Sequence, residues 1–341
     1  GQIDGFRRLV RTVRSFDALS LTPEPLSTRD VLARHIDDPL LTDMILCPLM
    51  YYGNAAETDM DFAQFCVMFR SVFLEGLCRP RHGMRHILNL ITERYAACGG
   101  RLRLACGVAE MRLAEARIRD VVLDDGATVR PQAVLSSAGY LETLRLCRPV
   151  PAEAEETAPG WFSVVELIAE LDCRLADLGL DVPVVFFNRS ERFRFERPGR
   201  PLDTDSGLLC APGNAGLPAG SDEERILRLT NLADYEHWFG LEPDAYREQK
   251  ANCLRRQLQA LDRMVPGAAE HVVFTDAFTP KTIARYTGHL NGAVYGTPAK
   301  SRTGRTPVEN LFVCGTDPGF LGIVGAMLSG VSIANLPLLL P

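Results

Sequence analysis

The sequence predicts an α/β fold with two lobes, and three features of its 341 residues support this expectation. An apolar strand, a glycine-rich turn and a helix of small residues follow one another in residues 311–335. A helix, a strand and a hairpin occupy residues 84–137. Short apolar runs with the spacing of strands fill residues 161–232, and they predict a mostly antiparallel sheet in a mixed-sheet lobe.

The first 77 residues are predicted to be helical. Apolar residues at helical spacing indicate a helix over 3–18, and Ser27 caps a second helix. Helical character continues over 38–50 and over the strongly apolar segment 59–77. This last segment is either a core helix or the wall of a pocket for a long apolar substrate, and periodicity does not separate the two.

The segment 78–150 is predicted to combine one helix with several strands. A basic turn leads into a helix that ends at the glycine pair Gly99-Gly100, which is typical of a helix C-terminus. Asp124-Asp125-Gly126 has the composition of a hairpin turn. Strands are expected at residues 101–105, 108–113, 117–123 and 128–137.

The segment 151–299 is predicted to form most of a substrate lobe. Residues 151–160 are rich in proline, glutamate and alanine and indicate a linker. A charged amphipathic helix is expected at 243–264. Strands are expected at residues 161–171, 182–187, 207–210, 226–232 and 272–274.

The C-terminal segment 300–341 contains the most informative motif. A strand at Leu311–Cys314 leads into a turn that carries Asp317, and a helix begins at about Val324. The N–H groups and the dipole of a helix N-terminus favour a ligand with negative character. A flat ligand can lie against the backbone because four glycines here lack a Cβ, namely Gly315, Gly319, Gly322 and Gly325.

These residues, in this order, resemble the closing flavin-binding segment of the FAD-dependent phytoene desaturase, carotenoid isomerase and retinol saturase family, which is related to the amine oxidases. The resemblance implies that the segment lies along the ribityl chain and pyrophosphate of FAD, with Asp317 accepting a hydrogen bond from a ribityl hydroxyl. The alternative is a tight packing turn in which Asp317 caps a helix. The implied cofactor-binding residues are Gly315, Thr316, Asp317, Gly322, Val324, Gly325 and Ala326.

Two further segments carry the same resemblance. The unit from the helix before Gly99 to Gly139 resembles the part of the family that completes the FAD-binding lobe, where the residue matching Val108 meets the adenine through its backbone. The resemblance therefore implies an FAD-binding, Rossmann-like lobe made from 78–150 and 300–341, and a substrate lobe made from 1–77 and 151–299.

The third segment contains the candidate catalytic residues. The motif Gly292-Ala-Val-Tyr-Gly296 resembles the part of the family that lies close to the flavin ring, so Tyr295 is a candidate and His289 is a candidate proton donor. The alternatives are an ordinary turn and a structural histidine. The turn Pro80–Met84 resembles a Pro-x-Gly-Gly-Met turn near the flavin, but His82 replaces the first glycine and becomes a third candidate.

No G-x-G-x-x-G follows a strand anywhere in the sequence. In the family this fingerprint opens the chain and binds the FAD pyrophosphate. We therefore expect the Rossmann-like lobe to be incomplete at its N-terminus. We also expect the chain to be a fragment that binds FAD weakly by itself and is inactive alone.

The resemblance implies an FAD-dependent oxidoreductase that acts on carbon–carbon bonds of a long apolar polyene or isoprenoid, as in carotenoid biosynthesis. Desaturation, saturation and isomerisation use the same parts, and the sequence does not decide among them. One alternative is an amine-oxidase-type flavoenzyme with an aromatic cage for a small amine. The other is a truncated flavoprotein relative without catalytic activity.

Composition narrows the partners and the compartment. The net charge of −6 and a pI of about 5.6 give no indication of nucleic-acid binding. The ten cysteines lack C-x-x-C spacing, so reduced thiols in a cytoplasmic protein are expected, with neither disulfides nor a metal site. Peripheral membrane contact is a hypothesis based on the apolar substrate and on residues 62–74.

Overall fold

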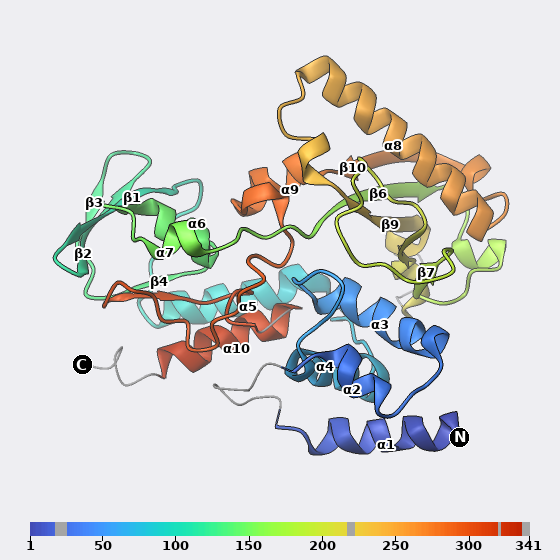
Figure 1. Ribbon diagram of the computed structural model, residues 1–341. Coiled ribbons are helices and arrows are strands. Elements are labelled where there is room, and N and C mark those ends of the chain that lie inside the picture. Colours follow the sequence, from blue (N-terminus) through green and yellow to red (C-terminus); the bar gives the residue numbers. More distant parts are fainter. Residues whose placement is uncertain (18–25, 217–221, 320–321, 336–341) are drawn as a thin grey trace.

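The computed structural model describes residues 1–17, 26–216, 222–319 and 322–335 (Figure 1). Residues 320–321 and 336–341 of the C-terminal segment therefore lie outside the described residues. The helices are α1 Gln2–Ser15, α2 Thr28–Ala33, α3 Pro39–Gly53, α4 Phe62–Phe69, α5 Gly83–Ala97, α6 Tyr140–Leu146, α7 Glu153–Glu156, α8 Pro243–Met264, α9 Pro280–Thr287 and α10 Gly322–Ala334. The strands are β1 Val108–Ala114, β2 Arg117–Leu123, β3 Thr128–Val129, β4 Val134–Ser136, β5 Cys147–Arg148, β6 Ser163–Leu171, β7 Val184–Asn188, β8 Ser206–Cys210, β9 Ile226–Ala233, β10 Val272–Phe278 and β11 Leu311–Val313.

The predicted α/β fold is confirmed, and its strands form three sheets. The largest is antiparallel, with the strand order β10-β6-β9-β8-β7. A second sheet has the order β3-β2-β1-β5. In the third, β11 pairs in parallel with β4, although more than 170 residues separate them in sequence. This last pairing brings the C-terminal motif beside the end of the 78–150 segment.

The five-stranded sheet is covered on both faces. Buried leucines and alanines of β6, β8 and β9 pack against Ala260 and Leu261 of α8. On the other side, Phe162, Val164 and Leu232 belong to a core shared with α1 to α4. This arrangement makes one well-packed body of helix, sheet and helices (Figure 1).

The apolar segment 59–77 forms α4 and then a π-helix over Arg70–Glu75. Phe62, Phe65 and Phe69 of α4 are at most 1% exposed and stack against one another, so they form part of the core. Phe73 and Leu74 of the π-helix are 43% and 36% exposed. The first half of this segment is therefore a core helix.

The lobe with β1 to β5 and β11 has a smaller core, centred on Met111, Ile118, Cys147 and Leu311. α5 has no buried residue, and α10 buries only Ser329 and Ile333 within the described part of the chain. The exposed apolar residues of these two helices include Leu88, Leu90, Ile91, Tyr95, Ile323, Val324, Met327, Leu328 and Val331. The exposed surfaces of α5 and α10 are therefore more apolar than the surface that a helix normally presents to water.

Two sequence predictions for this region are wrong. Residues 101–105 form a loop instead of a strand, and Leu102 and Leu104 are 59% and 79% exposed. An isolated strand is not stable, and the described residues provide no strand that pairs with this segment. The expected linker at 151–160 contains α7, whose Ala154 packs against Leu141 and Leu144 of α6.

Within the described ranges, no helix combines the length and apolar character needed to cross a membrane.

Candidate functional site

The glycine turn after β11 has the shape of an open cradle. Gly315, Gly319 and Gly322 have φ values of 95°, 84° and 74°, a backbone region that favours glycine. Among the described residues, a Cβ added at Gly315 or Gly319 would approach no atom closer than 3.8 Å or 3.5 Å, and one added at Gly322 would meet nothing within 4 Å. The described part of the chain therefore leaves the backbone of these three glycines without close packing.

Other glycines nearby have the opposite surroundings. A Cβ at Gly160 would overlap the Gly296 carbonyl, one at Gly296 would overlap the Asp317 carboxylate, and one at Gly304 would overlap Ile333. These glycines allow close packing of chain segments. The glycines of the turn differ from these three, because no atom of the described residues packs closely against them.

The turn is tied to α10 by one buried serine. The backbone N–H of Gly315 donates to Ser329 Oγ at 2.7 Å, and Ser329 Oγ donates to the carbonyl of Ala326 at 2.7 Å. Val324, near the start of α10, is 70% exposed. The positive end of the helix dipole thus lies beside the open turn, which favours a ligand with negative charge.

Asp317 is only 2% exposed, and its carboxylate joins three chain segments. One oxygen accepts a hydrogen bond from the backbone N–H of Tyr140. The other accepts from the backbone N–H of Thr297 at 3.0 Å and from Lys300 Nζ at 3.4 Å. The predicted hydrogen bond to a ribityl hydroxyl stays a prediction, because both oxygens already serve donors of the chain. We call this set, Tyr140, Thr297, Lys300 and Asp317, the junction.

Lys300 is a largely buried cation at the junction. Its amine also donates to the carbonyl of Tyr295 at 2.5 Å. Burial lowers the pKa of Lys300, and the nearby Asp317 carboxylate opposes this shift. No feature of the sequence pointed to Lys300, because its partners are brought to it by contacts between distant segments.

Tyr295 contacts the junction through its backbone carbonyl, which accepts a hydrogen bond from Lys300, and its ring lies in the aromatic core. Its ring stacks on Phe162 with centroids 5.4 Å apart and an interplanar angle of 7°. Its hydroxyl donates to the carbonyl of Tyr51 at 3.1 Å, and burial raises its pKa. The ring of Phe162 contacts the rings of both Tyr51 and Tyr295, so the described geometry is that of a filled core.

A buried donor without a partner lies beside these rings. The indole of Trp161 contacts Phe162 and Phe195, with centroids 5.8 Å and 5.4 Å away. Its Nε1–H is buried and has no hydrogen-bond partner among the described residues. A donor of this kind is available to a polar group of a ligand.

The structure places the two candidate histidines differently. His289 is 9% exposed, its Nδ1 lies 2.8 Å from the carbonyl of Ala293, and its ring lies beside Gly139. His289 therefore lies on the same segment as Tyr295. His82 lies on the exposed turn before α5, where its ring contacts His86 at a centroid distance of 5.4 Å.

The remaining predicted cofactor-binding residues lie in two places, the glycine turn with α10 and the strand β1. Thr316 belongs to the turn, and Gly325 and Ala326 belong to α10, beside Gly322 and Val324. Val108 opens β1, where it lies opposite Leu123. Pairing of β4 with β11 joins the lobe segment of Val108 to that of the turn.

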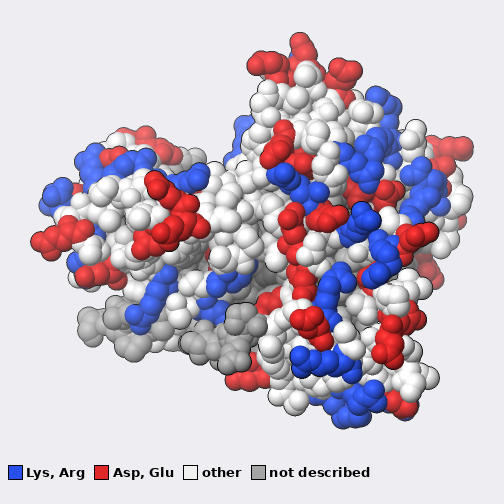
Figure 2. Space-filling model, in the orientation of Figure 1, with Lys and Arg blue, Asp and Glu red and all other residues white. Residues whose placement is uncertain are grey.

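The visible surface supports a site between the two lobes. Figure 2 shows a hollow between the part that holds β1 to β3 and the part that holds β6 to β10. Positive and negative side chains are interspersed on this face, without a large field of one sign.

Two known proteins resemble this chain in sequence at low identity. The chain is 23% identical over 335 residues to a chloroplastic prolycopene isomerase of Arabidopsis thaliana, covering 91% of this chain and 54% of that protein. It is 22% identical to a 4,4'-diaponeurosporene oxygenase of Staphylococcus haemolyticus, covering 98% of this chain and 67% of that protein. It thus spans about half the length of the first of these relatives.

A solved structure shows the same fold. An oxidoreductase from Methanosarcina mazei superimposes with a TM-score of 0.64 at 14% identity, and the match covers 98% of this chain and 73% of that one. The family model of flavin containing amine oxidoreductases matches residues 17–336, which is nearly the whole chain and includes the glycine turn. The chain belongs to the family of flavin-containing amine oxidoreductases.

Proposed function

We propose that this chain is part of an FAD-dependent oxidoreductase that acts on carbon–carbon bonds of a long apolar polyene or isoprenoid. The observation that carries the proposal is the open glycine turn between β11 and α10, where Gly315, Gly319 and Gly322 leave room for a flat anionic group. Membership of a flavin-containing family supports a flavin as that group.

The residues present fit the cofactor. Gly315, Thr316 and Gly322 would offer backbone to it, and Val324, Gly325 and Ala326 would present the N-terminal turn of α10. Asp317 would hold the turn in place through the junction, and Val108 would contact the adenine. A bound flavin would supply hydride transfer between a substrate carbon and its ring.

The other residues of the site would orient the substrate and exclude water. Tyr295 and Phe162 stack on each other in the aromatic core next to the junction and would hold its shape, and the N–H of Trp161 would be available to a polar substrate group. His289 is the one candidate for moving a proton here, since His82 lies on an exposed turn. A polyene substrate is supported by the names of the two relatives, an isomerase of prolycopene and an oxygenase of diaponeurosporene.

We further propose that the active protein includes a nucleotide-binding unit that covers α5 and α10. Both helices expose apolar side chains. Among the described residues, the sheet formed by β4 and β11 contains two strands, so each of them has an edge that a further strand could pair with. A strand followed by G-x-G-x-x-G and a helix would extend this pair and would bury the apolar face. Such a unit can be encoded in the same reading frame or supplied by a partner.

The test uses the complete protein encoded by the gene of this chain. It should co-purify with FAD, and after addition of prolycopene in detergent its carotenoid absorption spectrum should change. A small primary amine such as cyclohexylamine should give no hydrogen peroxide. Turnover of the amine without turnover of the polyene would establish the amine-oxidase alternative, and absence of flavin would establish the non-catalytic one.

Peripheral membrane contact is proposed for the π-helix and the turn after it. Phe73, Leu74 and Leu77 are 43%, 36% and 57% exposed and lie together in sequence. An apolar polyene is delivered most directly from a lipid phase. The complete protein should float with liposomes, and recovery entirely in the soluble fraction would contradict this proposal.

A further inference from the structure

Three side chains of metal-binding type meet at one end of the β6–β10 pair. Asp172 and Cys173 directly follow β6, and His271 directly precedes β10. The two strands are antiparallel, with Val272 opposite Leu171, so the end of one lies beside the start of the other. The backbone N–H of Asp172 donates to the carbonyl of His271 at 2.9 Å, which fixes the two segments together.

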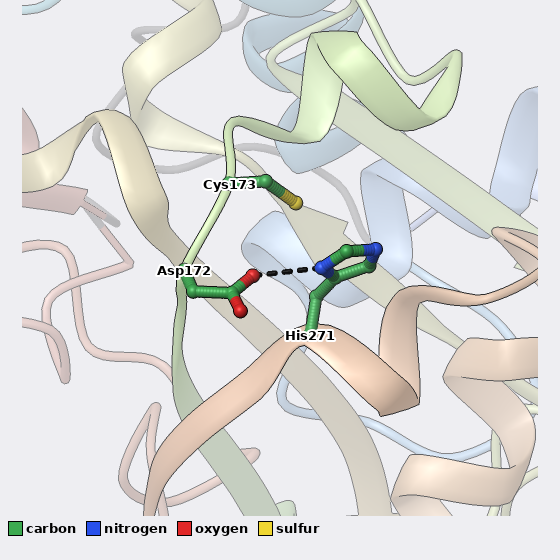
Figure 3. A group of neighbouring side chains, drawn as sticks. All are labelled: Asp172, Cys173 and His271. Atoms are coloured by element: carbon green, nitrogen blue, oxygen red, sulfur yellow. Dashed lines mark hydrogen bonds and ion pairs between the residues drawn. The ribbon is translucent and has the colours of Figure 1, made fainter.

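The side chains of these three residues converge, as Figure 3 shows. The carboxylate of Asp172 lies 2.7 Å from Nδ1 of His271. One ligand atom from each residue lies within 4.8 Å of the others, and the described ranges contain no second group of this kind. The side chains of Asp172 and His271 are 57% and 41% exposed, so water reaches the group.

This set of atoms suits zinc. Thiolate, imidazole and carboxylate are its usual protein ligands, with bonds of about 2.0 to 2.3 Å. A tetrahedral ion with such bonds holds its ligand atoms about 3.3 to 3.8 Å apart. The pair of Asp172 and His271 would have to open by less than about 1 Å from its present separation, and both exposed side chains have freedom to do so.

A second interpretation, a reactive thiol activated by a histidine, is disfavoured by the geometry. Nδ1 of His271 lies 2.7 Å from the carboxylate of Asp172, and Figure 3 marks no hydrogen bond between His271 and Cys173. The imidazole is therefore oriented by the carboxylate and is not paired with the thiol.

We propose that Asp172, Cys173 and His271 bind a zinc ion, with water as the fourth ligand. The ion would join the turn after β6 to the turn before β10. The site shares no residue with the glycine turn or the junction, so it is independent of the proposed flavin chemistry. It differs from the expectation of no metal site, which rested on sequence motifs: Asp172 and His271 are 99 positions apart, and no short metal-binding motif contains them.

The experiment is a titration of the purified chain, freed of metal, with Co²⁺ as a spectroscopic probe and with Zn²⁺ in competition against a chromophoric chelator. The wild-type chain should bind one ion and develop a thiolate-to-cobalt charge-transfer band. Cys173→Ser should lose this band, and both Cys173→Ser and His271→Gln should bind Zn²⁺ at least about 10-fold more weakly. Cys98→Ser is the matched control, since Cys98 is an exposed cysteine outside the group and its loss should change neither quantity.

The thermal unfolding temperature gives a second readout, because an ion that binds only the folded chain stabilises it. Zn²⁺ should raise this temperature equally for the wild type and for Cys98→Ser, and should raise that of Cys173→Ser by a smaller amount at the same Zn²⁺ concentration. Circular dichroism verifies that each variant is folded. Equal Zn²⁺ affinity in the wild type and Cys173→Ser, or a wild-type cobalt complex without a charge-transfer band, would overturn the proposal.

Discussion

The two lobes of this chain differ in how completely they bury their helices. In the lobe built on β6 to β10, α8 covers one face of the sheet and α1 to α4 cover the other. In the lobe that carries the glycine turn, α5 and α10 expose most of their apolar residues. The first lobe is stabilised by its own core, whereas the second leaves apolar side chains of α5 and α10 exposed.

The largest expected effect contrasts an apolar residue in the buried core of the first lobe with an apolar residue on the exposed face of α5. Phe65→Ala removes a fully buried ring and should lower the free energy of unfolding by about 3–5 kcal/mol. Ile91→Ala on α5 truncates a side chain that is 42% exposed, so the free energy of unfolding should change by less than about 0.5 kcal/mol. Urea unfolding of both variants measures the difference. A large loss for Ile91→Ala would mean that α5 is packed in solution.

The second effect concerns Asp317. Asp317→Ala leaves the buried N–H groups of Tyr140 and Thr297 without an acceptor, and it should cost about 3 kcal/mol, at roughly 1–3 kcal/mol per orphaned group. Asp317→Asn keeps one acceptor oxygen and should cost less. Thermal unfolding measures both.

A different result would reassign Asp317. If Asp317→Ala unfolds like the wild type while the complete protein loses its flavin, the carboxylate serves the ribityl chain and does not brace the junction.

The third effect compares two glycines with the same backbone strain. Gly322 and Gly179 have φ values of 74° and 85° with nothing within 4 Å of an added Cβ, so alanine at either should cost about 1–2 kcal/mol of stability. Only Gly322→Ala adds a methyl group where the cofactor is proposed. Flavin content of the complete protein should fall in this variant alone, and an equal fall in Gly179→Ala would show that stability is the cause.

The fourth effect depends on pH. Because burial lowers the pKa of Lys300, its protonated form destabilises the folded state at pH values below that pKa, and this penalty fades as the pH rises toward the ordinary value for lysine. Lys300→Met should therefore unfold at a higher temperature than the wild type near pH 7. The difference in unfolding temperature between Lys300→Met and the wild type should become smaller as the pH rises. A variant less stable than the wild type at pH 7 would show that the pairing with Asp317 outweighs the cost of burial.

The smallest effect is a difference in thiol reactivity between the lobes. Burial raises the pKa of Cys66 from 9.0 to about 12, which lowers its thiolate population on the order of a thousandfold. Cys78 and Cys98, which flank α5, are exposed. Iodoacetamide at neutral pH should label Cys78 and Cys98 first, as peptide mass spectrometry will show, and early labelling of Cys66 would contradict the packed core.

Local patterns were enough to predict most elements. The helix over 243–264 and the strands of the antiparallel sheet follow from periodicity and occur where expected. The segment 101–105 was mispredicted because its alternating leucines satisfy a local pattern, whereas a strand also requires a partner. The order of strand, glycine turn and helix at the C-terminal end was predictable because its residues are contiguous, and the binding of a cofactor there stays a prediction.

The junction and the zinc group were not predictable in this way. Lys300, Tyr140 and Thr297 reach Asp317 only through the packing of distant segments. Asp172 and His271 meet only because β6 pairs with β10. No local signal in the sequence encodes these contacts.

The central claim, that a flavin lies against the bare backbone of the glycine turn, is tested most directly by amide hydrogen exchange of the complete protein with and without FAD. Exchange in residues 314–326 should slow when FAD binds, while exchange in α8 should stay unchanged. Binding of FAD that protects other segments and leaves 314–326 unaffected would contradict the claim.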